Sequence, residues 1–329
     1  MVDVSVDGAK GSRRGVSLES MSIRESHRTA VTLPDVVLSQ YARFSLYNSP
    51  YPAHDGGCAV DLYPGTLRDG RTTAAPSPVS GTVLETRTVR APPKPYAVEH
   101  DHLILLECDG PSPLEGLIAR ILHVEPSVAA GDKVDRGDSL GALVRAGFFA
   151  PWVDNHLHVG FRTPDQHLHR ASGSLPLELG VGVRPLEWDG TGTVVATGET
   201  YAVLDAPAHP APGTGFVGIG LDDGGVIDGG LPHYDGGGVH GRGALVADRP
   251  LEDRNPHVSL NGDHLGVVGS DGRTITWANV PVTVAGEPIT GLSTFCARDG
   301  DFGAKLICPD LEISVGETVR VGVGSNGEQ

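Results

Sequence analysis

The chain has 329 residues, including 46 glycines and 25 prolines, and its formal net charge is −16. This length favours about two domains, each large enough to bury a core without disulfides. The 41 acidic residues outnumber the 25 basic ones, and no basic stripe exists to neutralise phosphates, so nucleic acid is not an expected partner. No run of about 18 apolar residues occurs, so no membrane span is expected.

The N-terminus and the cysteines favour a cytoplasmic location. Arg13 and Arg14 are followed by serines and glutamates instead of an apolar segment, which is unlike a twin-arginine export signal. Acidic residues spread along the whole chain suit the surface of a protein from a salt-rich cytoplasm. Four cysteines show no paired metal-ligand spacing and suit reduced, mostly buried thiols, and a Cys296–Cys308 hairpin disulfide stays open as an alternative. The four are Cys58, Cys108, Cys296 and Cys308.

Short apolar runs punctuated by glycine and proline predict an all-β protein. Residues 1–28 are polar and unpatterned, and we expect a flexible N-terminal arm there. Helical periodicity is confined to Leu33–Phe44 and Leu114–Leu117. A first domain is expected over residues 29–162, with strands near residues 79–89, 103–107, 119–124, 139–144 and 156–161.

Residues 163–190 have weak periodicity and are expected to form a connection. A second domain of unknown role is expected over residues 191–329. Its short strands, at a spacing of roughly 8 to 12 residues, are typical of a β-sandwich or an open barrel. These strands are expected near residues 193–197, 201–204, 215–221, 257–260, 265–269, 274–278, 280–284, 304–308 and 319–323.

The residues that could carry chemistry begin with the His-x-His pair His156 and His158. In a strand, alternation would place both imidazoles on one face, about 7 Å apart. One could then bind a metal while the other reaches its water. An isolated pair is also typical of a solvated strand face. The chain holds two further pairs of this kind, His100/His102 and His167/His169.

A glycine-turn segment stands between His123 and this pair. Residues 131–141 (GDKVDRGDSLG) begin about eight residues after His123 and end about fifteen before His156. Such a segment describes a strand that turns twice on glycine, as in the flattened barrels of the lipoyl and related hybrid-motif folds. Together with His-x-His, it resembles the lysostaphin/LytM-type zinc endopeptidases, which share a duplicated hybrid motif. The resemblance implies a flattened hybrid-motif barrel or sandwich for the first domain, followed here by a C-terminal β-sandwich.

The family also has an N-terminal histidine and aspartate. Residues 54–64 (HDGGCAVDLYP) supply His54 and Asp61, and residues 75–83 (APSPVSGTV) resemble the strand that follows the aspartate in the family. All five polar positions of the family therefore have counterparts in the expected order. The resemblance covers about residues 45–162.

Carried over position by position, the resemblance implies that His54, Asp61 and His158 bind zinc, with water in the fourth position. Two neutral imidazoles and one carboxylate would leave a net +1 charge on the metal, which acidifies the bound water and polarises a carbonyl. His156 would act as general base on that water, and His123 would stabilise the oxyanion or orient the nucleophile. The implied activity is that of a zinc metalloendopeptidase or amidase, with a peptide or amide substrate as partner.

Two departures from the family leave alternatives open. Six residues separate His54 from Asp61, where the family usually has three, and seven steps along a straight strand would point the side chains to opposite faces. A bulge at Gly56-Gly57 could restore the geometry; otherwise Asp55 or Cys58 is the ligand, or the site is empty. The family's glycine-rich lead into His-x-His is replaced by residues 148–155 (FFAPWVDN). The rival function is a non-catalytic binding or scaffold protein with a structural or vestigial metal site.

Other candidate residues have equally plain structural interpretations. Residues 231–241 (LPHYDGGGVHG) form either a flexible hairpin connection or a second metal loop. Glu125 could orient an imidazole or be an exposed charge at a turn. Trp152 and Trp188 could line a cleft or fill a core.

Overall fold

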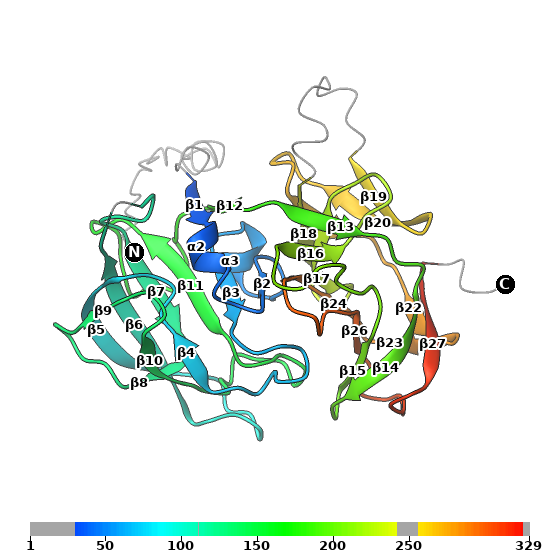
Figure 1. Ribbon diagram of the computed structural model, residues 1–329, viewed down its shortest axis with the longest axis horizontal. Coiled ribbons are helices and arrows are strands. Elements are labelled where there is room, and N and C mark those ends of the chain that lie inside the picture. Colours follow the sequence, from blue (N-terminus) through cyan, green and yellow to red (C-terminus); the bar gives the residue numbers. More distant parts are fainter. Residues whose placement is uncertain (1–29, 111, 242–255, 325–329) are drawn as a thin grey trace, which may run out of the picture.

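The computed structural model describes residues 30–110, 112–241 and 256–324, and the prediction of an all-β fold is confirmed (Figure 1). Helix in these residues is limited to two single turns, α2 (Asp35–Leu38) and α3 (Pro52–Asp55). None of the described helices is long and apolar enough to cross a membrane. The expected arm at residues 1–28 lies outside the described residues.

Both predicted helices are wrong beyond the single turn of α2. The first range is divided among β1 (Val31–Pro34), α2 and β2 (Arg43–Ser45). Phe44 is buried in β2, which lies between two other strands of a sheet, so at this end of the range strand pairing outweighs a loose helical period. The second range forms a hydrogen-bonded turn, in which the Leu117 amide donates to the Leu114 carbonyl at 3.0 Å.

Most strands of the first half of the chain form, together with three strands from the second half, a ten-stranded sheet with the order β13-β16-β25-β2-β3-β11-β7-β6-β5-β9. Its strands besides β2 are β3 (Val60–Tyr63), β5 (Gly81–Arg90), β6 (His100–Cys108), β7 (Ile118–Leu122), β9 (Lys133–Val134), β11 (Leu157–Arg162), β13 (Val183–Leu186), β16 (Phe216–Ile219) and β25 (Cys296–Ala297). A three-stranded sheet shares its core and consists of β4 (Ala74–Pro76), β10 (Ser139–Leu143) and β8 (Val124–Pro126).

Alternation along four of these strands separates a core face from a functional face. The core face carries apolar side chains, namely Val60, Leu62, Ile104, Leu106, Ala119, Ile121, Val159 and Phe161. Asp61, Arg120 and His158 stand between these residues in the sequence, so their side chains point to the opposite face of the sheet. The fold thus places the polar residues together on one face, with the packed core behind it.

The second half forms a twelve-stranded sheet with the order β19-β20-β21-β18-β17-β24-β26-β15-β14-β27-β22-β23. The strands are β14 (Thr191–Thr197), β15 (Tyr201–Leu204), β17 (Val226–Leu231), β18 (Gly236–His240), β19 (His257–Leu260), β20 (Asp263–Val268), β21 (Thr274–Trp277), β22 (Val282–Val284), β23 (Glu287–Ile289), β24 (Gly291–Thr294), β26 (Lys305–Ile307) and β27 (Thr318–Val323). A separate apolar cluster forms the core of this half and includes Trp188.

The glycine-rich segment of the second half is ordered β-structure. Strands β17 and β18 pair as a buried antiparallel hairpin, so residues 236–240 are not a flexible connection. A Cβ atom at Gly238 would lie 2.1 Å from the Tyr47 ring, and one at Gly237 would lie 2.2 Å from Trp277. Glycine is needed here because neighbouring rings pack directly on the backbone.

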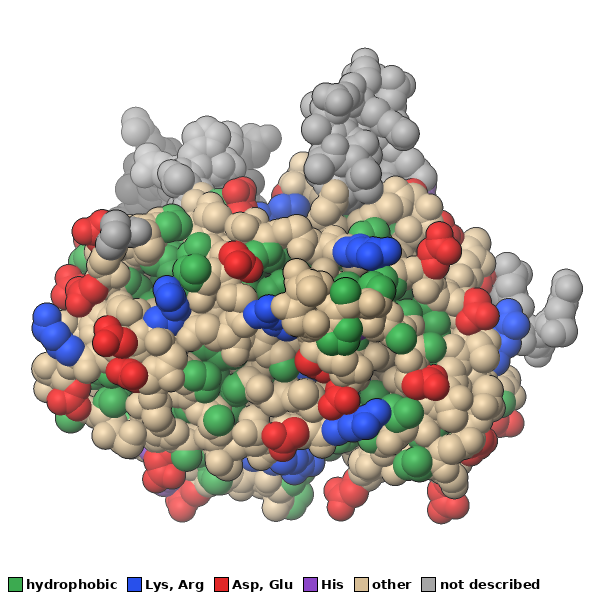
Figure 2. Space-filling model, in the orientation of Figure 1, with side chains coloured by type: hydrophobic (Ala, Val, Ile, Leu, Met, Phe, Trp, Pro, Cys, Tyr) green, Lys and Arg blue, Asp and Glu red, His purple; other side chains and the backbone are tan. Residues whose placement is uncertain are grey.

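The two halves share hydrogen-bonded structure. Strand β25 pairs with β2, with Arg43 opposite Ala297 and Phe44 opposite Cys296. The range 163–190, expected as a connection, holds two strands: β12 (Leu177–Gly180) pairs with β1, and β13 pairs with β16 at one end of the ten-stranded sheet. The four cysteines form no disulfide with one another, so the alternative Cys296–Cys308 bridge is absent. On the face in Figure 2, acidic side chains are scattered among basic ones.

Candidate metal centre

Three elements bring His54, Asp61 and His158 together. Asp61 and His158 are directly opposite each other in the pairing of β3 with β11. His54 lies in the single turn α3, which starts at Pro52 and ends where Gly57, with φ of +60°, donates its amide to the His54 carbonyl at 3.0 Å. The two glycines therefore act by ending a helical turn, and not through a bulge in a strand.

The ligand atoms of these three residues have the spacing that zinc requires. The His54 Nε2 to His158 Nδ1 distance is 3.1 Å, His54 Nε2 lies 3.3 Å from Asp61 Oδ1, and His158 Nδ1 lies 3.0 Å from the same oxygen. Tetrahedral zinc, with bonds of about 2.0 to 2.1 Å, places its ligand atoms about 3.3 Å apart. The donor set and its distances therefore fit a zinc ion.

A backbone carbonyl orients one of the imidazoles. His54 Nδ1 donates to the Leu46 carbonyl at 2.7 Å, so in the neutral ring the Nε2 lone pair faces the cluster. A second hydrogen-bond partner of this kind fixes the tautomer of a metal-binding histidine.

Charge in the cluster suits a cation. Burial opposes ionisation of Asp61, but the nearby His156 and His54 and the hydrogen bond from His158 hold its pKa well below its usual range. Burial lowers the pKa of His158 to about 4, against the attraction of Asp61. Burial also disfavours charge on His54, but Asp61 outweighs it and raises the pKa of that imidazole. A metal would compete with this one proton.

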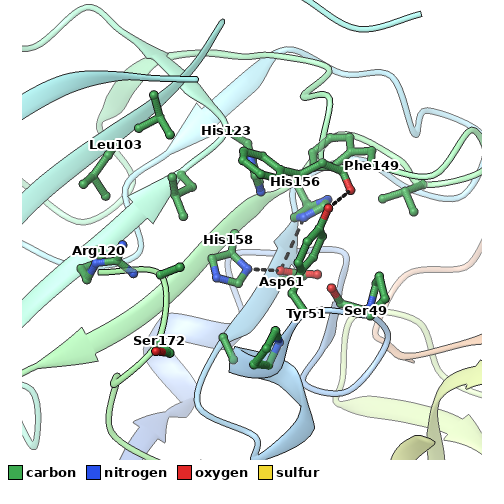
Figure 3. Close-up of a pocket in the computed structure, with 18 of the residues that line it drawn as sticks. Ser49, Tyr51, Asp61, Leu103, Arg120, His123, Phe149, His156, His158 and Ser172 are labelled. Carbon is green, nitrogen blue, oxygen red and sulfur yellow. Dashed lines mark hydrogen bonds and ion pairs between the residues drawn. The ribbon is translucent and has the colours of Figure 1, made fainter. Parts of the chain in front are cut away.

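His123 and His156 lie beside the cluster (Figure 3), and Nδ1 of each ring has a hydrogen-bond partner. His156 Nδ1 donates to the Asp154 carbonyl at 2.9 Å, and its Nε2 lies 3.5 Å from Asp61 Oδ1. His123 Nδ1 lies 2.6 Å from Asp101 Oδ2. The centroids of the two rings are 5.2 Å apart. Burial lowers the pKa of His156 to about 4, so this imidazole is neutral and can accept a proton at Nε2.

Asp101 is a residue that the sequence interpretation missed. It is fully buried, whereas Glu125, the residue considered for orienting an imidazole, is exposed. Asp101 occupies the same strand face as Leu103 and Leu105, because alternate residues of β6 share a face. The sequence signal that could identify Asp101 is a carboxylate at the same strand period as two leucines.

The cluster opens into a cleft of about 370 Å³. On one side, the Tyr51 hydroxyl donates to the Phe148 carbonyl at 3.1 Å, and the two rings meet edge to face. Residues 148–155, which stand where the LytM-type family has a glycine-rich segment, thus supply a wall of the cleft. Tyr234, from the second half of the chain, also lines it. Apolar and aromatic side chains dominate the lining, among them Val89, Leu103, Leu122, Phe148, Phe149 and Tyr234.

The second half also holds the loop that orients His54. Asp228 on β17 accepts the Leu46 amide at 2.8 Å, and Leu46 in turn accepts the hydrogen bond from His54. Asp228 also accepts the Ser45 hydroxyl at 2.5 Å and is paired with His240 at 2.8 Å. Hydrogen bonds through the Leu46 peptide therefore connect Asp228, in the second half, to His54, a candidate metal ligand in the first half.

The alternative ligands lie outside the cluster. Asp55 is exposed, and Cys58 directs its thiol to the Gly56 carbonyl at 3.6 Å. In the part of the chain that the structure describes, His54, Asp61 and His158 are the one group of three whose ligand atoms lie within 4.8 Å of one another. Residues 231–241 therefore do not form a second metal loop. Of the two tryptophans, Trp188 fills the second core, and Trp152 meets His233 edge to face.

Comparison with known proteins gives two matches. Residues 32–179 match the family described as domain of unknown function (DUF8155) N-terminal domain. Residues 184–324 match the C-terminal domain of the same family. No curated protein matches the chain. The chain is therefore similar to the two domains of this family, in the same order along the sequence.

Proposed function

We propose that the chain is a zinc-dependent hydrolase that cleaves a peptide or amide bond, as a metalloendopeptidase or amidase. The observation that carries the proposal is the cluster of three ligand atoms at mutual distances of 3.1, 3.3 and 3.0 Å. The cluster faces a cleft and has two further histidines beside it. The order of these five residues in the sequence, which resembles that of the lysostaphin/LytM-type enzymes, supports the same chemistry.

Zinc bound at this cluster would polarise a carbonyl and lower the pKa of a bound water. His156 is suited to take a proton, because its Nδ1–H is held by the Asp154 carbonyl and its Nε2 faces the cluster. His123 is suited to donate one. Burial opposes charge on Asp101, but His123 outweighs it and lowers the pKa of that carboxyl, so a carboxylate lies 2.6 Å from His123 Nδ1 and holds the ring where it could stabilise an oxyanion.

The apolar lining of the cleft has a chemical role in this proposal. Aromatic walls around a charged cluster exclude bulk water, so that hydrogen bonds and charges act through a lower dielectric constant. Tyr51, Phe148 and Phe149 form such a wall next to the histidines. The same cleft would accommodate the chain of a peptide substrate.

The test combines metal analysis with an unbiased search for cleavage. Protein purified in high salt without chelator should contain one zinc per chain by elemental analysis. It should cleave members of a pool of N-blocked peptides, detected by mass spectrometry, and lose this activity after EDTA until zinc is restored. His156→Ala should keep the zinc and lose the cleavage.

The rival is a binding or scaffold protein with a metal that performs no turnover. One observation favours it: the ligand atoms already hydrogen-bond one another, so the cluster is satisfied as a structural element. Bound zinc with no cleavage anywhere in the pool, and unchanged ligand binding in His156→Ala and His123→Ala, would support the rival. A cytoplasmic location stays a prediction from the sequence.

A further inference from the structure

The cleft contains a buried positive charge that the proposed hydrolysis does not use. Arg120 on β7 is 4% exposed and lines the cleft. Burial, followed by repulsion from the neighbouring Arg162, lowers the pKa of Arg120 to about 10. The guanidinium is therefore still charged at neutral pH. Among the described residues, no carboxylate contributes to its pKa or forms an ion pair with it.

The two neighbouring arginines differ in how well their donors are satisfied. Arg162 donates to the backbone carbonyls of His167, Arg170 and Ser172, and so serves to hold the loop that follows β11. In the part of the chain that the structure describes, Arg120 has one acceptor, the Leu168 carbonyl, which takes Nε–H at 2.6 Å. The two Nη groups of Arg120 therefore have no hydrogen-bond acceptor among the described residues.

Strand register places Arg120 beside His158 of the metal cluster. Leu122 is opposite His158 and Arg120 is opposite Gly160 in the pairing of β7 with β11. Arg120 and His158 are thus diagonal neighbours on one sheet face, with Cα atoms about 7 to 8 Å apart. Figure 3 shows both side chains extending from neighbouring strands into the same cleft.

A buried, unpaired guanidinium is unfavourable unless a counterion joins it. Its planar fork of donors matches the two oxygens of a carboxylate. An apolar cleft strengthens such a pair because it excludes water.

We propose that Arg120 binds a carboxylate of the ligand, so that the site selects peptides with a carboxylate close to the bond at the metal. The carboxylate could be the C-terminal one of the peptide or belong to an acidic side chain. That the bound peptide is cleaved rests on the proposed function, whereas the binding of its carboxylate does not. The inference adds a specificity residue to the five that the sequence indicated.

The experiment measures binding by calorimetry, with and without zinc. One probe pair is N-acetyl-alanyl-alanine and its C-terminal amide. The other is N-acetyl-aspartyl-alaninamide and its asparaginyl analogue. In at least one pair the acid should bind about tenfold more tightly than its neutral partner, which is the effect of a charge-assisted hydrogen-bonded pair. The pair that shows the difference identifies the source of the carboxylate.

Variants assign this preference to Arg120. Arg120→Gln should abolish it, and Arg120→Lys, which keeps the charge without the fork, should retain part of it. The matched control is Arg87→Gln. Arg87 lines the same cleft, but it is 51% exposed and already paired with Glu85 at 3.1 Å, so its loss should leave the preference intact. Thermal unfolding of each variant verifies folding, and Arg120→Lys keeps the test decisive if Arg120→Gln is unstable.

Equal binding of acid and amide in both pairs overturns the inference, as does a preference that survives in a folded Arg120→Gln. These outcomes are distinct from failure of the proposed function. Absence of zinc and of hydrolysis would overturn the hydrolase, yet a carboxylate preference of the EDTA-treated protein that depends on Arg120 would still establish the anion site.

Discussion

Outside the cluster of His54, Asp61 and His158, the described residues hold two buried aspartate–histidine pairs, and their surroundings differ. In the first half, Asp101 holds His123 at 2.6 Å, and the ring of His123 lines the cleft. In the second half, Asp228 holds His240 at 2.8 Å, and the ring of His240 packs against Phe44 and Tyr47.

The aspartates also differ in what else they bind. Asp228 takes the Ser45 hydroxyl and the Leu46 amide in addition to its histidine, and so it connects two parts of the fold. Asp101 takes the amide of the adjacent His102, which leaves its action directed at His123. Residue type and burial are alike in the two pairs. The two pairs differ in where the histidine ring lies. We therefore expect a catalytic role for the pair whose histidine lines a cleft, and a structural role for the pair whose histidine packs in a core.

The largest effect expected from this comparison concerns metal content. His158→Ala should lose the bound zinc, because two remaining ligands cannot hold it firmly. His240→Ala should keep one zinc per chain and lose about 1 to 3 kcal/mol of stability, since Asp228 stays buried with one partner fewer. Elemental analysis and chemical denaturation measure the two quantities. Equal zinc loss in both variants would break the distinction between the pairs.

The second prediction concerns turnover by the first pair. His123→Ala should keep the zinc and lower kcat by roughly 10² to 10⁴, the usual contribution of general acid–base catalysis. Asp101→Asn should lower kcat less, because the histidine remains in place. The rates are those of the most sensitive peptide in the cleavage pool. A kcat unchanged in His123→Ala would place this pair in the structural class as well.

The third prediction concerns acid stability of the metal-free protein. Burial lowers the pKa of His156 and of His158 from 6.5 to about 4, so between these values the unfolded chain binds more protons than the folded one. Stability should therefore fall as the pH is lowered through this window, by up to about 3 kcal/mol for each histidine. His54, whose pKa is raised, is charged in both states there and does not offset the loss.

Denaturation of the EDTA-treated protein at a series of pH values between about 7 and 4 measures this slope. His156→Phe should reduce it, because one buried neutral imidazole is gone. Stability that rises on acidification would show that the two imidazoles are charged in the folded state.

The smallest effect expected is on metal affinity through the second pair. Asp228→Asn should weaken zinc binding by roughly 10- to 100-fold, the usual consequence of altering a group that orients a ligand. Its route is the Leu46 peptide, which joins Asp228 to His54. Competition with a chromogenic chelator measures the affinity. Asp222→Asn is the matched control, because Asp222 binds two amides of a loop in the second half and should leave zinc affinity unchanged.

Much of the fold could be predicted where strands alternate. The strand at His257–Leu260 begins and ends where its pattern indicated, because four residues with an apolar period of two suffice. Strands of two or three residues, such as β9 and β25, are too short to show a period. Strand β17 contains two glycines among six residues, and since glycine has no side chain, its burial leaves no mark in hydropathy.

The candidate site divides in the same way. His54, Asp61 and His158 could be chosen because their order along the chain matched a known arrangement, and the structure brings them within 4.8 Å of one another. The sequence alone could not identify Asp228 and Arg120 as residues of the site. Their roles depend on the Leu46 peptide and on the register between β7 and β11, and such long-range pairings are not encoded in any local pattern.

Because β2 pairs with β25, the first half of the chain is not expected to fold as an independent unit. Cutting the chain near residue 180 would remove β25 and leave β2 as a bare sheet edge, which invites pairing with other chains. It would also remove the carboxylate behind Leu46. A gene fusion that replaced the second half is therefore expected to disturb the candidate ligand His54 without altering that residue, so the site depends on both halves of the chain.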